Sequence, residues 1–498
     1  MATTQSDRPP VAAPEEAASR FQRLPASIYD VVVIGAGSGG LSAAGMARAF
    51  DARVAVIERD RFGGECLYTG CVASKALLHV ARLAAQIRRA DALGLSAQLA
   101  PVDLGAVADH VRRVIEEVYV DSDAPENYAA MGIDVVIGAA HFESPSTISV
   151  NGQTITAKHA LVCTGSHPVV PALPGLTEAG FLTNETIFTA RRLPPRLLII
   201  GGGPIGCELG QAFARLGSQV TMLQRPERII PKDEPEASAV LTKRLTREGV
   251  TILTVAEATR VSVRGGEKVV EVRTPQGTGE IAVDEVLVAI GRAPTVEGLN
   301  LEAANVAYDT RKGITVDANM RTNNPRVYAA GDVTGGYLFT HAAARQARAA
   351  IRNMLFPSQS KVDERVTPWA TFTEPEVAHV GLTEAEARRL HGAEAQVYTQ
   401  AMTGVDRAVT EGETAGFTKL ICDKKGVILG AEIVGPSAGE FINEIALAMQ
   451  QEITMQQLAN TTHAYPTVAL SLQQAAGAFS LERATSSGVV KFLRKFGG

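Results

Sequence analysis

Two short apolar runs, each followed by a glycine-rich turn, organise the hydrophobic pattern of this chain. They are Val31–Ile34, before GAGSGG, and Leu197–Ile200, before GGGPIG. An apolar run of this length without polar alternation is typical of a strand buried on both faces of a parallel sheet. After each turn come a helix-forming segment and a second apolar strand, Arg53–Ile57 or Gln219–Leu223. The pattern therefore predicts two strand–turn–helix–strand units of the α/β class.

The first turn has the spacing of a dinucleotide-binding site. Gly35, Gly37 and Gly40 form G-x-G-x-x-G. This spacing allows a tight turn, close approach of a pyrophosphate and close helix–strand packing. Glu58 ends the following strand, where a carboxylate accepts hydrogen bonds from a ribose. The alternative is a glycine-rich turn without a ligand, but the strand, helix and acid together favour a nucleotide.

The second turn repeats the spacing with one change. Its glycines are Gly201, Gly203 and Gly206. At the end of the next strand stands Gln224 instead of an acid, followed by Arg225 and, three positions later, Arg228. A missing carboxylate beside arginine suits the 2′-phosphate of NADPH, so NADH is less favoured. Arg225 as an ordinary solvated charge remains the alternative.

Composition narrows the class of protein. The chain has 498 residues, enough for three to four domains, with 46% hydrophobic and 20% charged residues. A net charge of −5 argues against a nucleic-acid surface, and no apolar stretch of membrane-spanning length is free of charges or glycines. The first 28 residues lack an apolar core and read as a disordered tail, not a secretory signal.

The five cysteines indicate one reactive pair in a reducing cytoplasm, and not a structural disulfide framework. Cys66 and Cys71 lie close after the first turn, in GGECLYTGCVASK. The apolar periodicity after Cys66 predicts a helix beginning there, and a helix N-terminus lowers the pKa of a thiol. The cysteines at 163, 207 and 422 stand in or beside apolar runs and are expected to be inert packing residues.

Over residues 29–480 the chain resembles the class I pyridine nucleotide–disulfide oxidoreductases, the family of dihydrolipoamide dehydrogenase, glutathione reductase and mercuric reductase. Besides the two turns and the cysteine pair, the resemblance rests on CTG at 163–165, AIGRAPT at 289–295, VYAAGDVTGG at 327–336 and TFTEPEVAHVGLTEAEA at 371–387. It implies FAD in the first nucleotide site, NAD(P)H in the second, and a homodimer.

The resemblance also implies roles for individual residues. Cys66 would exchange with substrate, and Cys71 would form the charge-transfer complex with the flavin. Lys75 would lie near flavin N5, paired with Glu208, where a cation stabilises negative charge on the reduced ring. Asp332 would bind the ribityl chain. Further cofactor-binding residues implied by the motifs are Gly64, Thr164, Gly165, Gly291 and Gly331.

The implied fold is α/β with three layers: two Rossmann-like domains and a C-terminal α/β dimerisation domain. The expected division is a tail at 1–28, FAD-binding segments at 29–177 and 291–364, an NAD(P)H domain at 178–290, an interface domain at 365–480 and a tail at 481–498.

One departure from the family bears on the electron acceptor. Dihydrolipoamide dehydrogenase and glutathione reductase carry a histidine and a glutamate that move the substrate proton, where this chain has Tyr465 and Leu470. Tyrosine, with an ordinary pKa near 10, is a poor base at neutral pH. His463 would face the same way as Tyr465, but about 6–7 Å along an extended segment.

Mercuric reductase also has a tyrosine at this position, but it ends in two cysteines, whereas this chain ends VVKFLRKFGG. The family resemblance implies that Tyr465 of one subunit reaches the Cys66–Cys71 pair of the other. The expected enzyme passes electrons from NADPH through FAD and Cys66–Cys71 to Hg(II), Cu(II) or a small disulfide. The alternatives are dihydrolipoamide dehydrogenase and a redox-sensing flavoprotein.

Overall fold

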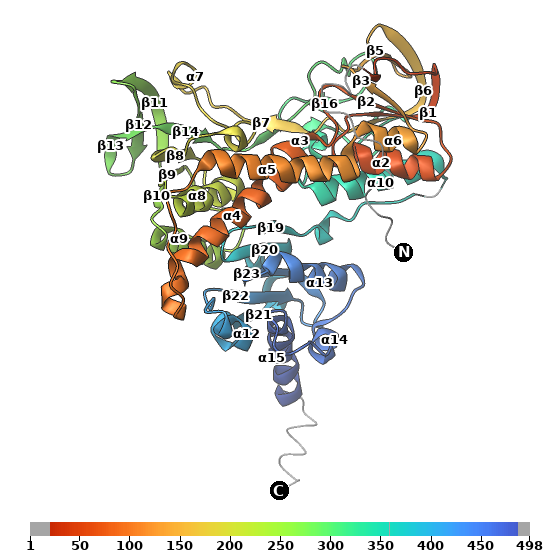
Figure 1. Cartoon of the computed structure of the whole chain (residues 1–498). Helices are drawn as coiled ribbons and strands as arrows, with labels where there is room; N and C mark the ends of the chain where they lie inside the picture. The colour runs from red at the N-terminus through yellow and green to blue at the C-terminus, as the bar shows by residue number, and fades with distance from the viewer. Residues whose placement is uncertain (1–19, 358, 487–498) are drawn as a thin grey trace, which may run out of the picture.

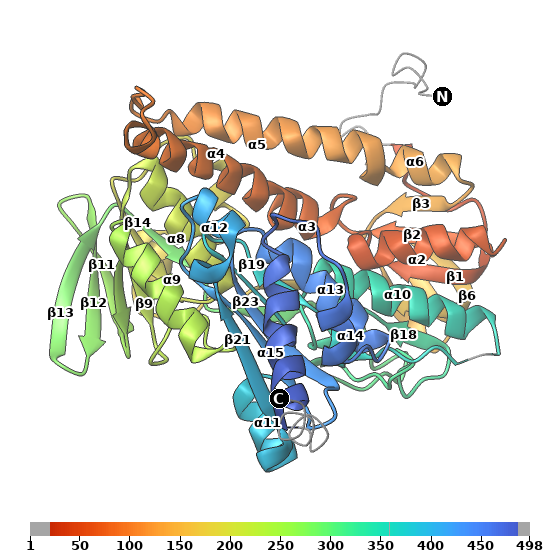
Figure 2. The same ribbon diagram turned by 90° about the horizontal axis from the view of Figure 1, so that it is seen from below.

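The structure, a computed structural model, describes residues 20–357 and 359–486. It has three sheet-containing parts (Figure 1): one built from the first strands of the chain, a second from its middle, and a third, drawn in blue, from its C-terminal quarter. The long helices α4 (Cys71–Arg89) and α5 (Leu104–Val118) run side by side from the first part towards the second (Figure 2).

The first part is a seven-stranded sheet whose central strand is the predicted apolar run. In spatial order the strands are β3 (Asp134–Ile137), β2 (Val54–Glu58), β1 (Ile28–Ile34), β6 (Gln153–Val162), β5 (Thr147–Val150) and β4 (His141–Ser144), with β18 (Val327–Ala329) beside β6. Strand β1 pairs in parallel with both β2 and β6. Burial of its residues from Val31 to Ile34 confirms the reading of a strand covered on both faces.

The second part repeats this plan with fewer strands. A parallel sheet has the order β10 (Thr251–Thr254), β9 (Gln219–Gln224), β8 (Arg196–Ile200) and β14 (Glu285–Val288). An antiparallel sheet beside it contains β11 (Glu257–Arg264), β12 (Glu267–Thr274) and β13 (Gly277–Val283). The chain enters and leaves this part through a two-stranded ribbon of β7 (Ser166–Pro168) and β15 (Arg292–Pro294).

The third part is an antiparallel sheet with helices packed on it. Its strands, in spatial order, are β19 (Trp369–Thr371), β20 (Glu376–Gly381), β23 (Ile428–Gly435), β22 (Phe417–Cys422) and β21 (Gln396–Ala401). Its helices are α11 (Glu384–His391), α12 (Asp406–Thr410), α13 (Ala438–Gln450), α14 (Met455–Asn460) and α15 (Leu470–Ser486).

The remaining helices belong to the first and second sheet-containing parts. They are α2 (Ser38–Ala49), α3 (Gly64–Tyr68), α6 (Pro125–Ala130), α7 (Leu176–Ala179), α8 (Pro204–Leu216), α9 (Pro235–Arg247) and α10 (Thr340–Leu355). Helices α2 and α10 pack against each other below the first sheet (Figure 1). Helix α4 packs against α8, so the helix that begins at Cys71 joins the first part to the second.

Buried charges join the second part to the third. Lys419 on β22 is almost fully buried, and its Nζ lies 3.0 Å from Glu234, 3.0 Å from Glu236 and 3.1 Å from Glu384. The three carboxylates surround one ammonium group, which offsets the cost of burying charge at this junction.

The structure corrects three expectations about element boundaries. Residues 20–28 are not a disordered tail: Leu24 is buried, and its amide donates to Gln153 Oε1 at 3.0 Å. The last helix runs through Ser486, beyond the expected domain end at 480, whereas 487–498 lie outside the described residues. The helix predicted to begin at Cys66 is interrupted, because α3 ends at Tyr68 and α4 starts at Cys71.

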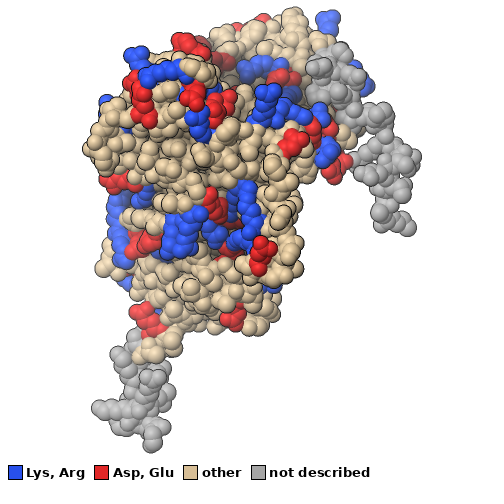
Figure 3. Space-filling model, turned by 60° about the vertical axis from the view of Figure 1, so that its left-hand side comes forward, with Lys and Arg blue, Asp and Glu red and all other residues tan. Residues whose placement is uncertain are grey.

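Along the described ranges, 20–357 and 359–486, we find no helix long and apolar enough to cross a membrane. On the face shown in Figure 3, lysine and arginine side chains gather in a band above the C-terminal part, with acidic side chains among them.

A pair of glycines in α2 tests the tight packing of the first turn. A Cβ on Gly40 would lie 1.8 Å from Gly35 O, whereas a Cβ on Gly45 meets nothing within 4 Å. Gly40→Ala should therefore destabilise the fold by about 1–3 kcal/mol or more, as overpacking does. Gly45→Ala should be neutral, or stabilising by roughly 0.5–1 kcal/mol through helix propensity. Thermal unfolding of both variants measures the difference, and equal effects would contradict this account.

Candidate active site

A cleft of about 430 Å³ opens at the first glycine-rich turn and has the size of a ligand pocket. Gly35 and Gly37 line it, and no atom lies within 4 Å of where a Cβ on Gly37 would be. Gly35 itself has φ +102°, and its Cβ would lie 2.4 Å from Cys163 O, so only glycine fits there. A ligand can thus approach the backbone beside the N-terminus of α2, as a pyrophosphate requires.

The predicted acid at the end of β2 also lines this cleft. Glu58 accepts hydrogen bonds from the Ala36 amide at 2.7 Å and the Asp60 amide at 2.9 Å. Burial raises the pKa of its carboxyl group, while these two amides act in the opposite direction. The carboxylate is held at the mouth of the turn, where it suits an adenosine ribose.

The predicted glycines and threonine of the later motifs lie where chain segments cross. Thr164 Oγ1 donates to Thr295 O at 2.7 Å, and the Thr295 amide donates to Gly165 O at 2.9 Å. A Cβ on Gly64 would lie 2.8 Å from Gly37 Cα. Among the glycines predicted to bind a cofactor, Gly201 (+116°), Gly291 (+132°) and Gly331 (+81°) also have positive φ. The second turn repeats the first, since a Cβ on Gly206 would lie 2.0 Å from the carbonyl oxygen at 201.

Asp332 follows Gly331 and is held by Ser166, whose hydroxyl donates to its carboxylate at 2.5 Å. Burial raises the pKa of the Asp332 carboxyl. Ser166, which the sequence did not single out, lines the cleft and connects it to the predicted acid Asp332. These side chains fit a flavin nucleotide: Glu58 would hold the ribose, the Gly35–Gly40 turn the pyrophosphate and Asp332 the ribityl chain.

The two predicted thiols lie next to each other but in unequal surroundings. Both are free cysteines, and Cys66 is half-buried on α3 while Cys71 is the first residue of α4. The break between these helices falls at Gly70, where a Cβ would lie 3.0 Å from Glu65 O. Cys71, rather than Cys66, therefore takes the N-terminus of the longer helix.

These surroundings move the two pKa values apart. Hydrogen bonding from Cys66 lowers the pKa of Cys71 to about 6, assisted by Thr340 and by the charge of Lys75. The same hydrogen bond, together with burial, raises the pKa of Cys66. The thiolate of the reduced pair is therefore at Cys71, the residue to which the family resemblance assigns the charge-transfer role. The other three cysteines are buried, and burial raises their pKa values.

Thr340 is a site residue that the sequence analysis missed. Its hydroxyl lies 3.0 Å from Cys66 Sγ and 3.3 Å from Cys71 Sγ, at the first position of α10. The only local signal was a hydroxyl residue that opens a helix after GDVTGG.

Lys75 and Glu208 form the predicted pair, with Nζ and Oε2 2.9 Å apart. Glu208 is buried on α8, and its other oxygen accepts the Phe372 amide at 2.9 Å. The Phe372 ring covers the lysine, with Nζ 4.3 Å from the ring centroid. Both carboxylate oxygens are satisfied, which a buried charge requires.

A second buried ion pair lies beside the cysteines. Glu65 precedes Cys66 and pairs with Arg292, while Asn184 Nδ2 donates to its carboxylate at 2.8 Å. Burial raises the pKa of Glu65 to about 7, although Arg292 opposes this. Arg292 also donates to Ser166 Oγ at 2.8 Å, which connects Glu65 to the Asp332 end of the cleft. A carboxylate between glycine and cysteine in GGECLYTGC was the signal that the sequence offered.

At the second turn, Gln224 takes the place of the usual acid and holds the turn itself. Its Oε1 accepts the Gly202 amide at 2.8 Å, and its Nε2 donates to Arg228 O at 3.1 Å. Arg228 donates to the carbonyl oxygens of Pro231 and Asp233, whereas Arg225 is 78% exposed. Of the two arginines, only Arg225 projects into solvent.

Tyr465 and Leu470 lie on the C-terminal part, away from these groups within one chain. Tyr465 is 69% exposed, and its hydroxyl donates to Asp406 at 2.8 Å. Leu470 is the first residue of α15. His463 Nε2 lies 3.1 Å from Glu444 Oε1, an interaction that the sequence did not reveal.

Family comparison agrees with this arrangement. Residues 29–347 match the pyridine nucleotide-disulphide oxidoreductase family, and residues 367–476 match the dimerisation domain of that family. The chain belongs to the pyridine nucleotide-disulphide oxidoreductases. It is therefore an FAD-dependent oxidoreductase of this family, and the α/β fold class predicted from the sequence is confirmed.

Relatives with different names share most of their length with this chain. A mercuric reductase of Bacillus cereus is 38% identical over 452 residues, covering 90% of this chain and 71% of its own. A dihydrolipoyl dehydrogenase of Thermus scotoductus is 36% identical over 467 residues, covering 90% and 97%. The Cu(II) complex of the HOCl-induced flavoprotein disulfide reductase RclA from Escherichia coli superposes with a TM-score of 0.81 at 28% identity, covering 91% of this chain and all of that one.

The Thr340 contact predicts a shift in thiol titration. In the two-electron-reduced protein, a long-wavelength band from the Cys71 thiolate should be present above about pH 6 and lost as the pH falls through that value. Thr340→Val removes one hydrogen bond to the thiolate, so the midpoint should rise by roughly one to two pH units. A pH titration of the band measures this, with Cys71→Ser as the variant without a band. An unchanged midpoint in Thr340→Val would refute the role of the hydroxyl.

Proposed function

We propose that this protein is a cytoplasmic, homodimeric NADPH-dependent reductase whose Cys66–Cys71 pair delivers electrons to a soft metal ion, Hg(II) or Cu(II). Bound FAD supplies the two-electron relay between nicotinamide and disulfide. The dimerisation-domain match supports the homodimer. In the proposed mechanism Lys75 and Glu208 hold a positive charge beside the reduced ring, and the Cys71 thiolate with Cys66 holds the metal.

The nicotinamide site supports NADPH. Gln224 has a neutral amide where a carboxylate would repel a 2′-phosphate, and this amide is hydrogen-bonded within the turn. Exposed Arg225 has one ion-pair partner, Glu257, at 3.5 Å, and Glu257 also pairs with Arg273. A phosphate would gain a charge-assisted contact with Arg225 at little cost.

The observation that carries the choice of acceptor is the residue at position 465. Its hydrogen bond to Asp406 raises the pKa of the Tyr465 hydroxyl above its ordinary value near 10, so at neutral pH this group keeps its proton. Tyr465 therefore cannot act as the base that dihydrolipoamide oxidation needs. With Leu470 following, no carboxylate stands at the orienting position either.

Metal reduction needs no such base. Thiolates are soft ligands that bind soft metal ions, and the electron pair passes without proton transfer to the acceptor. Each NADPH releases two electrons and a proton. The electrons reduce one Hg(II) to Hg(0) or two Cu(II) to two Cu(I), and the proton is released to solvent. The names of the mercuric reductase relatives and of the Cu(II) complex of RclA are consistent with this chemistry.

Dihydrolipoamide dehydrogenase is the second candidate, favoured by one contact. His463 and Glu444 form a histidine–glutamate pair, 3.1 Å apart, two residues before Tyr465. For His463 to replace the missing base, the segment between α14 and α15 would have to move. Relatives named dihydrolipoyl dehydrogenase, at 36% and 34% identity, also support this candidate.

The coenzyme preference can be tested at one side chain. Arg225→Ala should raise the KM for NADPH by about ten- to a hundredfold, because a charged hydrogen bond contributes roughly 1.5–3 kcal/mol, with little change for NADH. Arg264, an exposed arginine on β11 paired with Glu280, provides the matched control, and Arg264→Ala should change neither KM. A wild-type preference for NADH would overturn this part of the proposal.

The acceptor can be tested with a panel of substrates. Wild-type protein should reduce Hg(II) or Cu(II) faster than it turns over lipoamide or glutathione disulfide, since loss of acid–base catalysis costs about 10²–10⁴ in rate. Tyr465→Phe should lower the metal-dependent rate and leave flavin reduction by NADPH unchanged. Stopped-flow absorbance separates the two half-reactions.

Rapid lipoamide turnover by the wild type would reject metal reduction as the function. If His463→Gln then abolished that turnover while flavin reduction continued, the second candidate would replace the first.

A further inference from the structure

We propose that Glu374, in the C-terminal part, is a positioning residue for Lys75: clamped by Arg82, Gln211 and Arg215, it fixes the loop that holds the Lys75–Glu208 pair. This inference rests on the role proposed above for Lys75. It adds that the charge beside the flavin is set from a third segment of the chain, 299 positions after the lysine.

Helices α4 and α8 each present a matching row of side chains to the other. Lys75 and Arg82 lie two turns apart on α4, and Glu208 and Arg215 lie two turns apart on α8. This spacing puts each pair on one face of its helix. At one end of the contact Lys75 meets Glu208, and at the other Arg82 and Arg215 converge on one carboxylate, that of Glu374.

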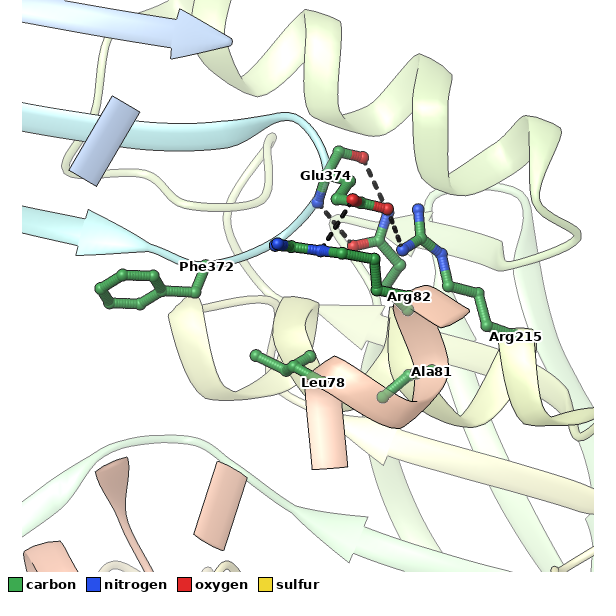
Figure 4. Close-up of a pocket in the computed structure, with 8 residues that line it drawn as sticks. Leu78, Ala81, Arg82, Arg215, Phe372 and Glu374 are labelled. Atoms are coloured by element: carbon green, nitrogen blue, oxygen red, sulfur yellow. Dashed lines mark hydrogen bonds and ion pairs between the residues drawn. The ribbon is translucent and has the colours of Figure 1, made fainter. Parts of the chain in front are cut away.

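Glu374 is clamped through both its side chain and its backbone. Arg82 Nε lies 2.8 Å from its carboxylate, and Arg215 pairs with the same group. The Glu374 amide donates to Gln211 Oε1 at 2.8 Å, and Gln211 Nε2 returns a hydrogen bond of 2.8 Å to Glu374 O. Figure 4 shows Arg82 and Arg215 reaching the glutamate from two different helices. Gln211 and Arg215 are buried, whereas the Arg82 side chain is 41% exposed, so the clamp is shielded from water on its α8 side.

The clamp acts on the lysine through Phe372, two residues earlier in the same loop. The Phe372 amide donates to Glu208 at 2.9 Å, and its ring covers Lys75 Nζ. A small cavity between α4 and α8 is lined by Phe372 and Glu374 together with Leu78 and Ala81 (Figure 4). The cavity is only about the size of one water molecule, so close packing and the charged clamp together hold the loop.

A second glutamate in the same part of the chain provides a matched control. Glu413 is also bridged by two arginines, Arg89 from α4 and Arg244 from α9. Glu374 and Glu413 have similar exposure, 22% and 20%. None of the interactions described for Glu413 involves Lys75 or Glu208. Removing the Glu413 side chain therefore tests the attachment of the third part to α4 and α9 without an effect on the position of Lys75.

The experiment compares Glu374→Ala and Glu413→Ala in the full-length, FAD-loaded protein. Glu374→Ala should slow flavin reduction at saturating NADPH by about 10- to 100-fold, the effect of a misplacement near 1 Å, with the Kd for NADPH unchanged. Amide hydrogen exchange of the peptide containing Phe372 should accelerate, and labelling of Lys75 by an amine reagent should increase. Glu413→Ala should leave all three unchanged. Glu374→Gln, which loses the charge but keeps a side chain that can hydrogen-bond to the two arginines, should give an intermediate effect and serves if the alanine variant does not fold.

Lys75→Met separates failure of this inference from failure of the proposed function. If Lys75→Met slows flavin reduction and the Glu374 variants do not, the clamp has no positioning role and the role of Lys75 stands. If Lys75→Met has no effect, the proposed role of the lysine falls, and this inference falls with it. Equal effects of Glu374→Ala and Glu413→Ala would mean that Glu374 only helps to hold the parts of the protein together, and this would overturn the inference.

Discussion

The contact between α4 and α8 is the constraint on which the rest of the site depends. Helix α4 begins at Cys71 in the first sheet-containing part, and α8 begins at the second glycine-rich turn. Their contact contains a buried carboxylate, that of Glu208, which would be costly without Lys75 and the Phe372 amide. Because this carboxylate on α8 needs donors from α4 and from the loop after β19, the two nucleotide sites and the third sheet are held in one arrangement.

The same helix makes two equal thiols unequal. Both cysteines belong to one short segment, yet the break at Gly70 puts Cys71 at the start of α4 while Cys66 stays on α3. The hydrogen bond from Cys66, assisted by Thr340 and by the nearby charge of Lys75, then lowers the pKa of Cys71 and favours its thiolate. The geometry of one helix start thus decides which sulfur carries charge, before any substrate is considered.

The sequence predicted those parts of the site that depend on local patterns. Apolar runs and glycine spacing gave β1, β8 and both turns, because their packing demands are met within about 30 residues. Thr340 and Glu374 were missed because their partners lie far along the chain; Thr340 is 274 positions from Cys66. Thr340 follows GDVTGG and Glu374 lies in the motif at 371–387, but neither local pattern identifies these distant partners. The helix break between Cys66 and Cys71 was missed because apolar periodicity continues through Gly70.

The two half-reactions of the proposed mechanism depend on very different kinds of structure. Lys75, Glu208 and Phe372 are tied together by contacts from three parts of the chain, so a change at any one disturbs the others. Tyr465 is exposed and bound to a single neighbour, Asp406. A substitution there alters acid–base chemistry at the acceptor without disturbing the buried charges. Tyr465 and Leu470, which replace the histidine and glutamate of dihydrolipoamide dehydrogenase, therefore require no change in how electrons arrive at Cys66–Cys71 in the proposed mechanism. On this proposal, one scaffold can serve disulfide and metal acceptors.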